Sequence, residues 1–132
     1  TIDLGQGVDH QIELTLRKVE AGAQYFLMQP IYNPNHFSRF LDIYGERHGQ
    51  SLTEPVFCGI QIMTEDSVIF SDVPEWVTDD LKRGRNGEEI AIQILHDTID
   101  AGYRSIYLIA PVLKGGRRDY EAAQRVIESF NR

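Results

Sequence analysis

Apolar residues recur along this chain with two different spacings. From Asp9 onward they fall at intervals of three or four, which is typical of one face of an amphipathic helix. The apolar positions of this run are Ile12, Leu16, Val19 and Ala23. Asp9 precedes them and belongs to a residue type that caps helices. The next segment, Tyr25 to Gln29, is a short continuous apolar run followed by proline, so we predict a buried strand there.

The same two patterns continue to the end of the chain. The predicted helices are His36 to Arg47, Glu88 to Asp100 and Asp119 to Phe130. The predicted strands are Val56 to Ile62 and Ile106 to Ala110. The segment from Thr64 to Leu81 is mixed: Val68 to Phe70 fits a strand or part of a short helix, and Val73 to Val77 fits a helix start with proline near its first turn. The glycine-rich residues before Asp9 predict a loop.

One stretch of the chain occurs twice. Lys18 to Pro30 is repeated in degraded form at Ile99 to Pro111. In each copy Ala-Gly ends a helical run and an apolar run then ends in proline, as expected for a helix followed by a buried strand. Repeated units with apolar strands predict an α/β fold in which helices cover parallel strands. The first copy ends in Gln29 where the second has Ala110, and this polar strand end is the first candidate functional residue.

Composition narrows the class of protein. A length of 132 residues, with 42% hydrophobic and 25% charged residues, predicts one globular domain over residues 1–132. The net charge of −7 argues against nucleic acid as the main partner. The lone Cys58 favours a reducing cytoplasm, and its apolar neighbours predict a small buried residue rather than a nucleophile. We expect no membrane span, because no apolar run is long enough. The histidines lack metal-ligand spacing, so we predict no metal site.

The predicted sheet is incomplete. Three parallel strands leave open edges and one poorly covered face, which natural proteins usually avoid. The chain begins with Thr1 rather than methionine, which favours a processed chain or a piece of a longer one. We therefore expect either further strands or a second copy of the chain to complete the sheet.

Several segments resemble, in order, the methylenetetrahydrofolate reductases. In that family a lysine-containing helix runs through Ala-Gly-Ala into a strand ending in glutamine, as in Lys18 to Gln29. The further matching segments are Phe37 to Leu41, Pro55 to Ile60, Val73 to Trp76 and Ile106 to Pro111. The reductase half of bifunctional homocysteine methyltransferase–reductase proteins is most similar, because there too glutamine-proline follows the strand.

The resemblance implies a partial (βα)8 TIM barrel. The family barrel runs to roughly 250 residues, so this chain matches about its carboxyl-terminal half. The implied enzyme is flavin-dependent and passes a hydride from NAD(P)H through FAD to 5,10-methylenetetrahydrofolate, in one-carbon and methionine metabolism. The resemblance also implies that an acidic proton donor and further flavin contacts lie on earlier strands. We therefore expect this chain to be inactive alone.

The resemblance also assigns residues to the site. Gln29 matches a glutamine that contacts the pterin of folate, and a primary amide can donate and accept hydrogen bonds at once. Lys18 matches a lysine that contacts the flavin. Gln11 stands where the family usually has a flavin-binding aspartate, so the charge is lost there.

The resemblance implies two further substrate contacts, at positions where the match is looser. Phe70 could match an aromatic residue that packs on folate, although a core phenylalanine is the simpler interpretation. Lys114 lies beyond the last strand, where the family has a basic residue near the substrate. With Gly115 to Arg118 it would open the final helix and favour anions, and a solvated turn is the alternative.

Two other classes of function remain open. A non-catalytic half-barrel would bind a partner chain or form a homodimer, and the low strand count, Gln11 and a short segment after Gly59 motivate this alternative. A folate- or pterin-binding module without flavin is the third.

Overall fold

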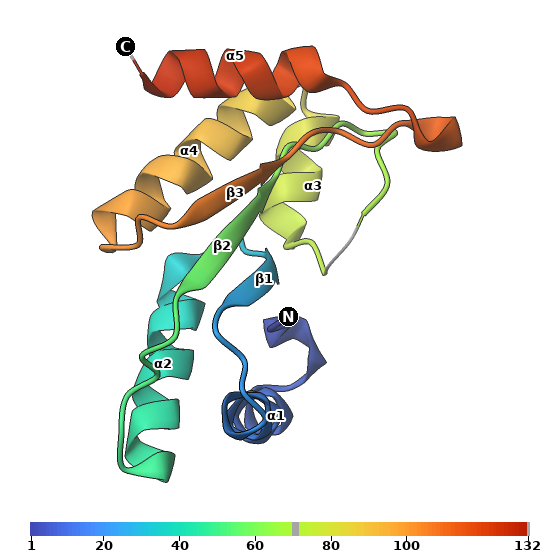
Figure 1. Ribbon diagram of the computed structural model, residues 1–132. Helices are drawn as coiled ribbons and strands as arrows, with labels where there is room; N and C mark the ends of the chain where they lie inside the picture. Colours follow the sequence, from blue (N-terminus) through green and yellow to red (C-terminus); the bar gives the residue numbers. More distant parts are fainter. Residues whose placement is uncertain (70–71, 132) are drawn as a thin grey trace.

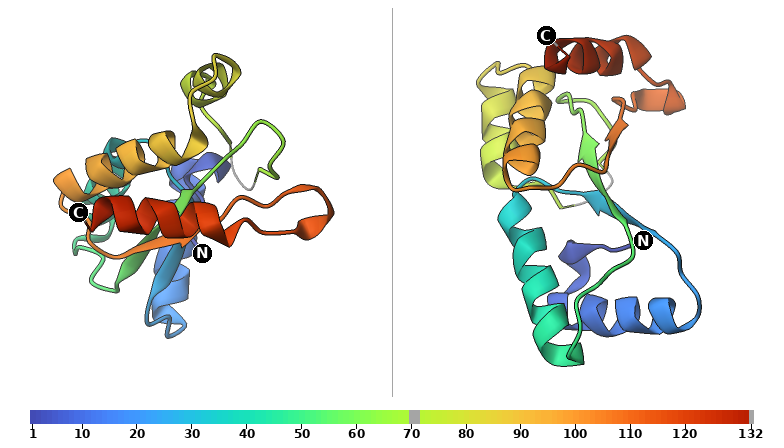
Figure 2. Two further views of the ribbon diagram at one scale, coloured as in Figure 1. Left: turned by 90° about the horizontal axis from the view of Figure 1, so that it is seen from above. Right: turned by 60° about the vertical axis from the view of Figure 1, so that its left-hand side comes forward.

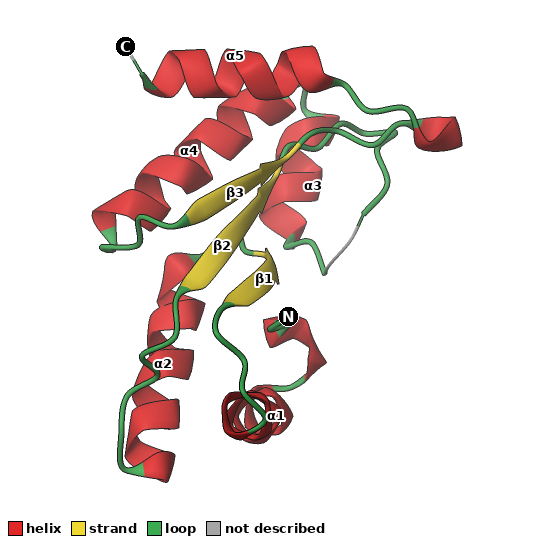
Figure 3. Cartoon of the chain, viewed as in Figure 1, coloured by secondary structure: helices red, strands yellow, loops and turns green. Residues whose placement is uncertain are grey.

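The computed structural model describes residues 1–69 and 72–131, and its centre is one sheet of three parallel strands in the order β1-β2-β3 (Figure 1). The strands are β1 (Phe26–Pro30), β2 (Val56–Gln61) and β3 (Ile106–Ile109). The helices are α1 (Val8–Glu20), α2 (Pro34–His48), α3 (Glu75–Lys82), α4 (Gly87–Asp100) and α5 (Tyr120–Phe130). Two short 3-10 turns are η1 (Leu4–Gln6) and η2 (Lys114–Gly116), and Figure 3 separates helix, strand and loop by colour.

The helices and strands predicted from periodicity are confirmed, with boundaries shifted by a few residues. In the mixed segment, helix α3 begins directly after Pro74, and Ile69 lies outside any strand. The prediction that Asp9 caps α1 is wrong: Gly7 is the N-cap and offers no side-chain hydrogen bond. Asp9 instead lies in the first helical turn, where a carboxylate is favoured by the helix dipole.

The amino-terminal residues are more ordered than the predicted loop. Ile2 is fully buried and pairs in parallel with Met28. Its N–H donates to the carbonyl of Leu27 (2.9 Å), and its carbonyl accepts from the N–H of Gln29 (2.8 Å). This segment therefore occupies a fourth strand position beside β1, which its glycine-rich composition concealed.

The helices pack on one face of the sheet. Alternate residues of a strand point to opposite faces, and the two buried clusters draw on only one of these two sets. That set consists of Phe26, Met28, Val56, Cys58, Ile60, Ile106 and Leu108. Figure 2 shows α2, α3 and α4 gathered on the same side of the strands. Within residues 1–69 and 72–131, no helix packs on the other face of the sheet.

The prediction that Cys58 is a small buried core residue is confirmed. Its side chain is fully buried in the cluster formed by β1, α1 and α2. Burial raises the pKa of the thiol to about 11, so it remains protonated near neutral pH and is a poor nucleophile.

Among residues 1–69 and 72–131, no helix has the length and apolar character needed to cross a membrane.

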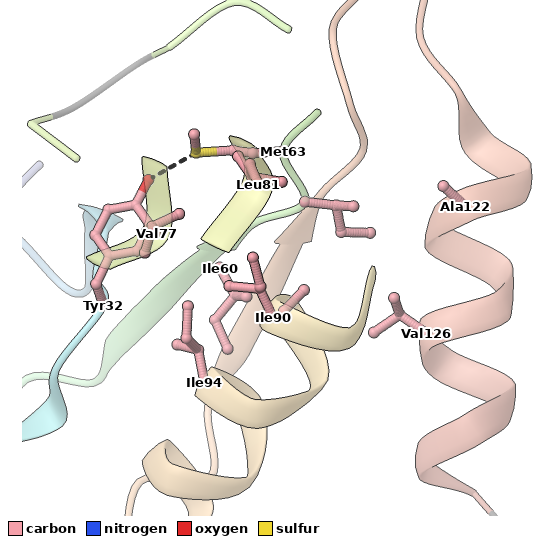
Figure 4. Close-up of a cluster of buried hydrophobic side chains, with 11 residues drawn as sticks. Tyr32, Ile60, Met63, Val77, Leu81, Ile90, Ile94, Ala122 and Val126 are labelled. Atoms are coloured by element: carbon pink, nitrogen blue, oxygen red, sulfur yellow. Dashed lines mark hydrogen bonds between the residues drawn. The ribbon is translucent and has the colours of Figure 1, made fainter. Parts of the chain in front are cut away.

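The second cluster joins β2 to α3, α4 and α5 and depends on a close approach at Gly87. Figure 4 shows Ile60, Ile90, Ile94 and Val126 as members of this cluster, with the Tyr32 hydroxyl bonded to the sulfur of Met63. Helix α4 starts so near to Met63 that a Cβ on Gly87 would overlap the Met63 carbonyl oxygen.

Replacing Gly87 with alanine should therefore destabilise the fold by roughly 1–3 kcal/mol, because the helix start must move away from Met63. Gly45 is the matched control: it lies inside α2, and its added Cβ would find no atom nearer than 3.9 Å. Gly45→Ala should leave stability unchanged or raise it by up to about 1 kcal/mol. Urea unfolding of both variants measures the difference, and equal midpoints would contradict the packing described.

Candidate functional site

A cavity of about 360 Å³ lies at the carboxyl end of β1. Three segments line it: residues 3–5 of the amino-terminal turn, residues 29–33 with His36 after β1, and residues 72–74 before α3. Parallel strands bring such connecting loops to one edge of a sheet, where most ligands of α/β proteins bind. The cavity is the strongest candidate for a binding site among the described residues.

Gln29 enters this cavity from an irregular part of β1. Leu27 pairs with Phe57 and Pro30 with Gly59, so β1 holds one more residue than β2 between these pairs. Such an extra residue re-aims side chains at a strand end. Gln29 is half-buried, and its side-chain amide has no hydrogen bond to any described residue. Its donors and its acceptor therefore remain available to a ligand.

Tyr107 holds the irregular end of β1 from the helix-free face. Its ring lies over Gly59, and its hydroxyl donates to the carbonyl of Met28. A Cβ on Gly59 would lie 2.7 Å from both oxygen atoms, so only glycine leaves room for this contact. Burial, and to a lesser extent the nearby Cys58, raises the pKa of Tyr107.

The cavity wall carries two carboxylates. Asp3 accepts the N–H of Gly5 through Oδ1 at 3.0 Å. A Cβ built on Gly5 would lie 3.2 Å from Oδ2 of Asp72 and 3.3 Å from Oδ1 of Asp3, so the two carboxylates flank this glycine. A wall of hydrogen-bond acceptors with negative charge suits a ligand that presents N–H groups and disfavours an anion.

Gln11 and Lys18 do not line this cavity. Gln11 is buried, and its side-chain oxygen accepts the N–H of Asp3 at 3.0 Å. The ammonium group of Lys18 donates to the carbonyl of Thr1 at 2.8 Å. Both α1 side chains therefore bind the backbone beside Ile2, on the side away from β1.

Lys114 is also apart from the cavity. It lies exposed in η2, and the following turn is closed by a bridge between Val112 and Arg118. The expectation that this basic segment opens the last helix is wrong, because α5 starts at Tyr120 and is capped by the side chain of Asp119. The substrate contact expected at Phe70 lies outside the described residues.

Gln61 is a polar strand end that the sequence analysis missed. It ends β2, is 3% exposed, and donates from Nε2 to the carbonyl of Val68 at 2.7 Å. Its buried Oε1 has no partner among the described residues. The rule that singled out Gln29, a polar residue at the end of an apolar strand, applies equally to Gln61.

No group of three or more His, Cys, Asp or Glu side chains within residues 1–69 and 72–131 is arranged to hold a metal ion.

The fold is similar to that of a solved structure. An uncharacterized protein from Clostridium thermocellum, described as binding two copies of 5-methyl-5,6,7,8-tetrahydrofolic acid, matches with a TM-score of 0.61 and 16% sequence identity. The match covers 95% of this chain and 49% of that one, so this chain spans about half of its length. No family model matches the sequence, and no curated protein is similar to it.

The hydroxyl of Tyr107 is open to a direct test. Tyr107→Phe keeps the ring over Gly59 but removes the bond to Met28, so stability should fall by about 1 kcal/mol. Because folding raises the Tyr107 pKa, the wild type should also lose stability as the pH rises above about 10, where the unfolded chain ionises first. The variant should show a shallower decline in urea unfolding between neutral and strongly alkaline pH. Identical profiles would place the hydroxyl in solvent.

Proposed function

We propose that this chain binds the pterin ring of a reduced folate in the cavity at the end of β1, as the carboxyl-terminal half of a methylenetetrahydrofolate reductase-like barrel. The observation that carries the proposal is the uncommitted amide of Gln29 inside that cavity. The similar fold of a protein described as binding a methyltetrahydrofolate supports it.

The half-barrel is supported by the number of strand–helix units. Ile2 and α1, β1 and α2, β2 with α3 and α4, and β3 with α5 make four units, all with parallel strands. A (βα)8 barrel contains eight such units. The share of the similar structure that this chain spans, 49%, agrees with a half.

The chemistry of the cavity suits a pterin. The pyrimidinone edge of that ring presents N–H groups beside a carbonyl, and the Gln29 amide can both accept from and donate to such an edge. The carboxylates of Asp3 and Asp72 are acceptors on the same wall. A volume of about 360 Å³ accommodates a bicyclic ring, so the glutamate tail would extend into solvent.

The proposed reaction is that of the whole enzyme, hydride transfer from NAD(P)H through FAD to 5,10-methylenetetrahydrofolate in one-carbon metabolism. When bound, the flavin supplies the hydride relay. Gln11 and Lys18 would hold it, but both are engaged with Thr1 and Asp3. These two residues therefore offer no ready flavin site in this chain.

Gln29→Leu should weaken binding of 5-methyltetrahydrofolate by about tenfold or more, because the amide edge of the ring loses its partner. Gln24→Leu is the matched control, since Gln24 is exposed and does not line the cavity. Calorimetric titration of the wild type and both variants measures the effect. Equal affinities in all three, or loss in both variants, would argue against a pterin contact at Gln29.

The purified chain, supplied with FAD and either nicotinamide nucleotide, should not reduce methylenetetrahydrofolate, because the residues expected for proton donation and most flavin binding are absent from it. Separate titrations with FAD and with folate distinguish a flavin-dependent enzyme half from a folate-binding module without flavin. Folate binding without flavin binding is expected. Turnover by the chain alone would show that it is a complete enzyme.

A further inference from the structure

Helix α4 starts at an asparagine followed by a glycine, Asn86 and Gly87. Asn86 is exposed and is the N-cap of the helix, and its side-chain oxygen accepts the N–H of Glu88 at 2.8 Å. The N–H of Gly87 precedes the first helical hydrogen bond and has no partner among the described residues. An exposed side-chain amide therefore lies next to an unbonded backbone nitrogen.

Gly87 is kept at this position by core packing. A Cβ here would overlap the carbonyl oxygen of Met63, so a larger residue would displace the start of the helix. Glycine is also the residue whose missing side chain hinders its own backbone nitrogen least. The packing against Met63 thus retains, directly after Asn86, the residue type that shields the asparagine least.

We propose that Asn86 is a site of spontaneous modification, at which the backbone nitrogen of Gly87 attacks the side-chain carbonyl carbon of Asn86. The new nitrogen–carbon bond closes a succinimide ring, and the side-chain nitrogen leaves as ammonia together with the proton of the attacking N–H. Water then opens the ring at either carbonyl and leaves aspartate or isoaspartate at this position. The reaction needs no oxidant, reductant or cofactor, and the inference is independent of the proposed folate site.

The cap hydrogen bond slows this reaction in the folded chain. The backbone of Asn86 is extended, with φ −71° and ψ 133°, and its side chain is held at the N–H of Glu88. The nitrogen of Gly87 can reach the side-chain carbon only after the cap bond is released. Helix ends open locally at a smaller free-energy cost than the core, so the modification proceeds through such openings without global unfolding.

The two products differ in their effect on α4. Aspartate keeps an oxygen for the N–H of Glu88 and is itself a favoured N-cap. Isoaspartate adds a methylene group to the main chain and moves the carboxylate out of the capping position. The main chain has no slack for this addition: Arg85 is fixed on one side by its N–H bond (2.9 Å) and ion pair (3.0 Å) to Asp80. On the other side Gly87 lies against Met63.

The chain contains its own matched controls. Asn33 is also an N-cap, that of α2, and accepts the N–H of Asn35 at 3.0 Å. It is followed by Pro34, which has no backbone N–H and cannot attack. Asn35 is as exposed as Asn86 by class, but the next residue, His36, carries a side chain.

Incubation in mildly alkaline buffer, followed by peptide mapping that separates aspartate from isoaspartate, tests the proposal. Asn86 should be modified at least about tenfold faster than Asn35, and Asn33 should remain intact. The same incubation in unfolding concentrations of urea should speed the reaction at Asn86 by at least about tenfold, because the cap is then absent.

Two variants test the consequence for α4. Asn86→Ser keeps a capping oxygen but has no amide, so its urea unfolding midpoint should not fall with incubation. Freshly purified Asn86→Asp, which reproduces one product, should have the wild-type midpoint. Wild-type chains that carry isoaspartate, separated by chromatography, should unfold at a lower urea concentration than either variant.

Several results would overturn the proposal. An Asn86 that stays intact in the folded chain throughout the incubation would mean that the cap does not open. Equal rates at Asn86 and Asn35 would remove the role assigned to Gly87, and equal rates in folded and unfolded chains would remove that of the cap. An unchanged midpoint for chains with isoaspartate would show that the start of α4 tolerates a longer main chain.

Discussion

The parallel direction of the strands is the constraint on which the rest of this structure depends. A parallel strand cannot follow its neighbour through a tight turn, so the chain returns through a helix each time. The helices cover one face of the sheet, and the sheet-facing core residues, from Phe26 to Leu108, point to that side. The same constraint gathers the connecting loops at the carboxyl ends of the strands, where the cavity lies. Binding site and uncovered face are thus two results of one topology.

The candidate site combines a rigid strand end with segments distant in the sequence. Gln29 is aimed by the extra residue in β1, which Tyr107 and Ile2 secure from two sides. The carboxylates come from the amino-terminal turn and from the loop before α3. A ligand in this cavity would therefore contact three parts of the chain at once, and the two carboxylates would disfavour an anionic group there.

Much of the fold could be predicted from the sequence, because strand and helix periodicity, Gly49 after α2 and the proline that ends β1 are local signals. The site could be predicted only at Gln29, whose polarity contrasts with its own strand. The pairing of Ile2, the neighbours of Gln11 and Lys18, and the carboxylates beside Gly5 depend on contacts between distant segments. No short sequence pattern encodes such contacts.

Gly59 and Tyr107 form a coupled pair, since a Cβ on Gly59 would overlap the Tyr107 ring as well as the Met28 carbonyl oxygen. In a related chain, a side chain at position 59 should therefore appear only after position 107 has become small and β1 has moved away at Met28. The reverse order would pass through an intermediate in which two bulky groups compete for one space. This dependence restricts the evolutionary paths open to the sheet, and it links the identity of one strand residue to the history of another in the next strand.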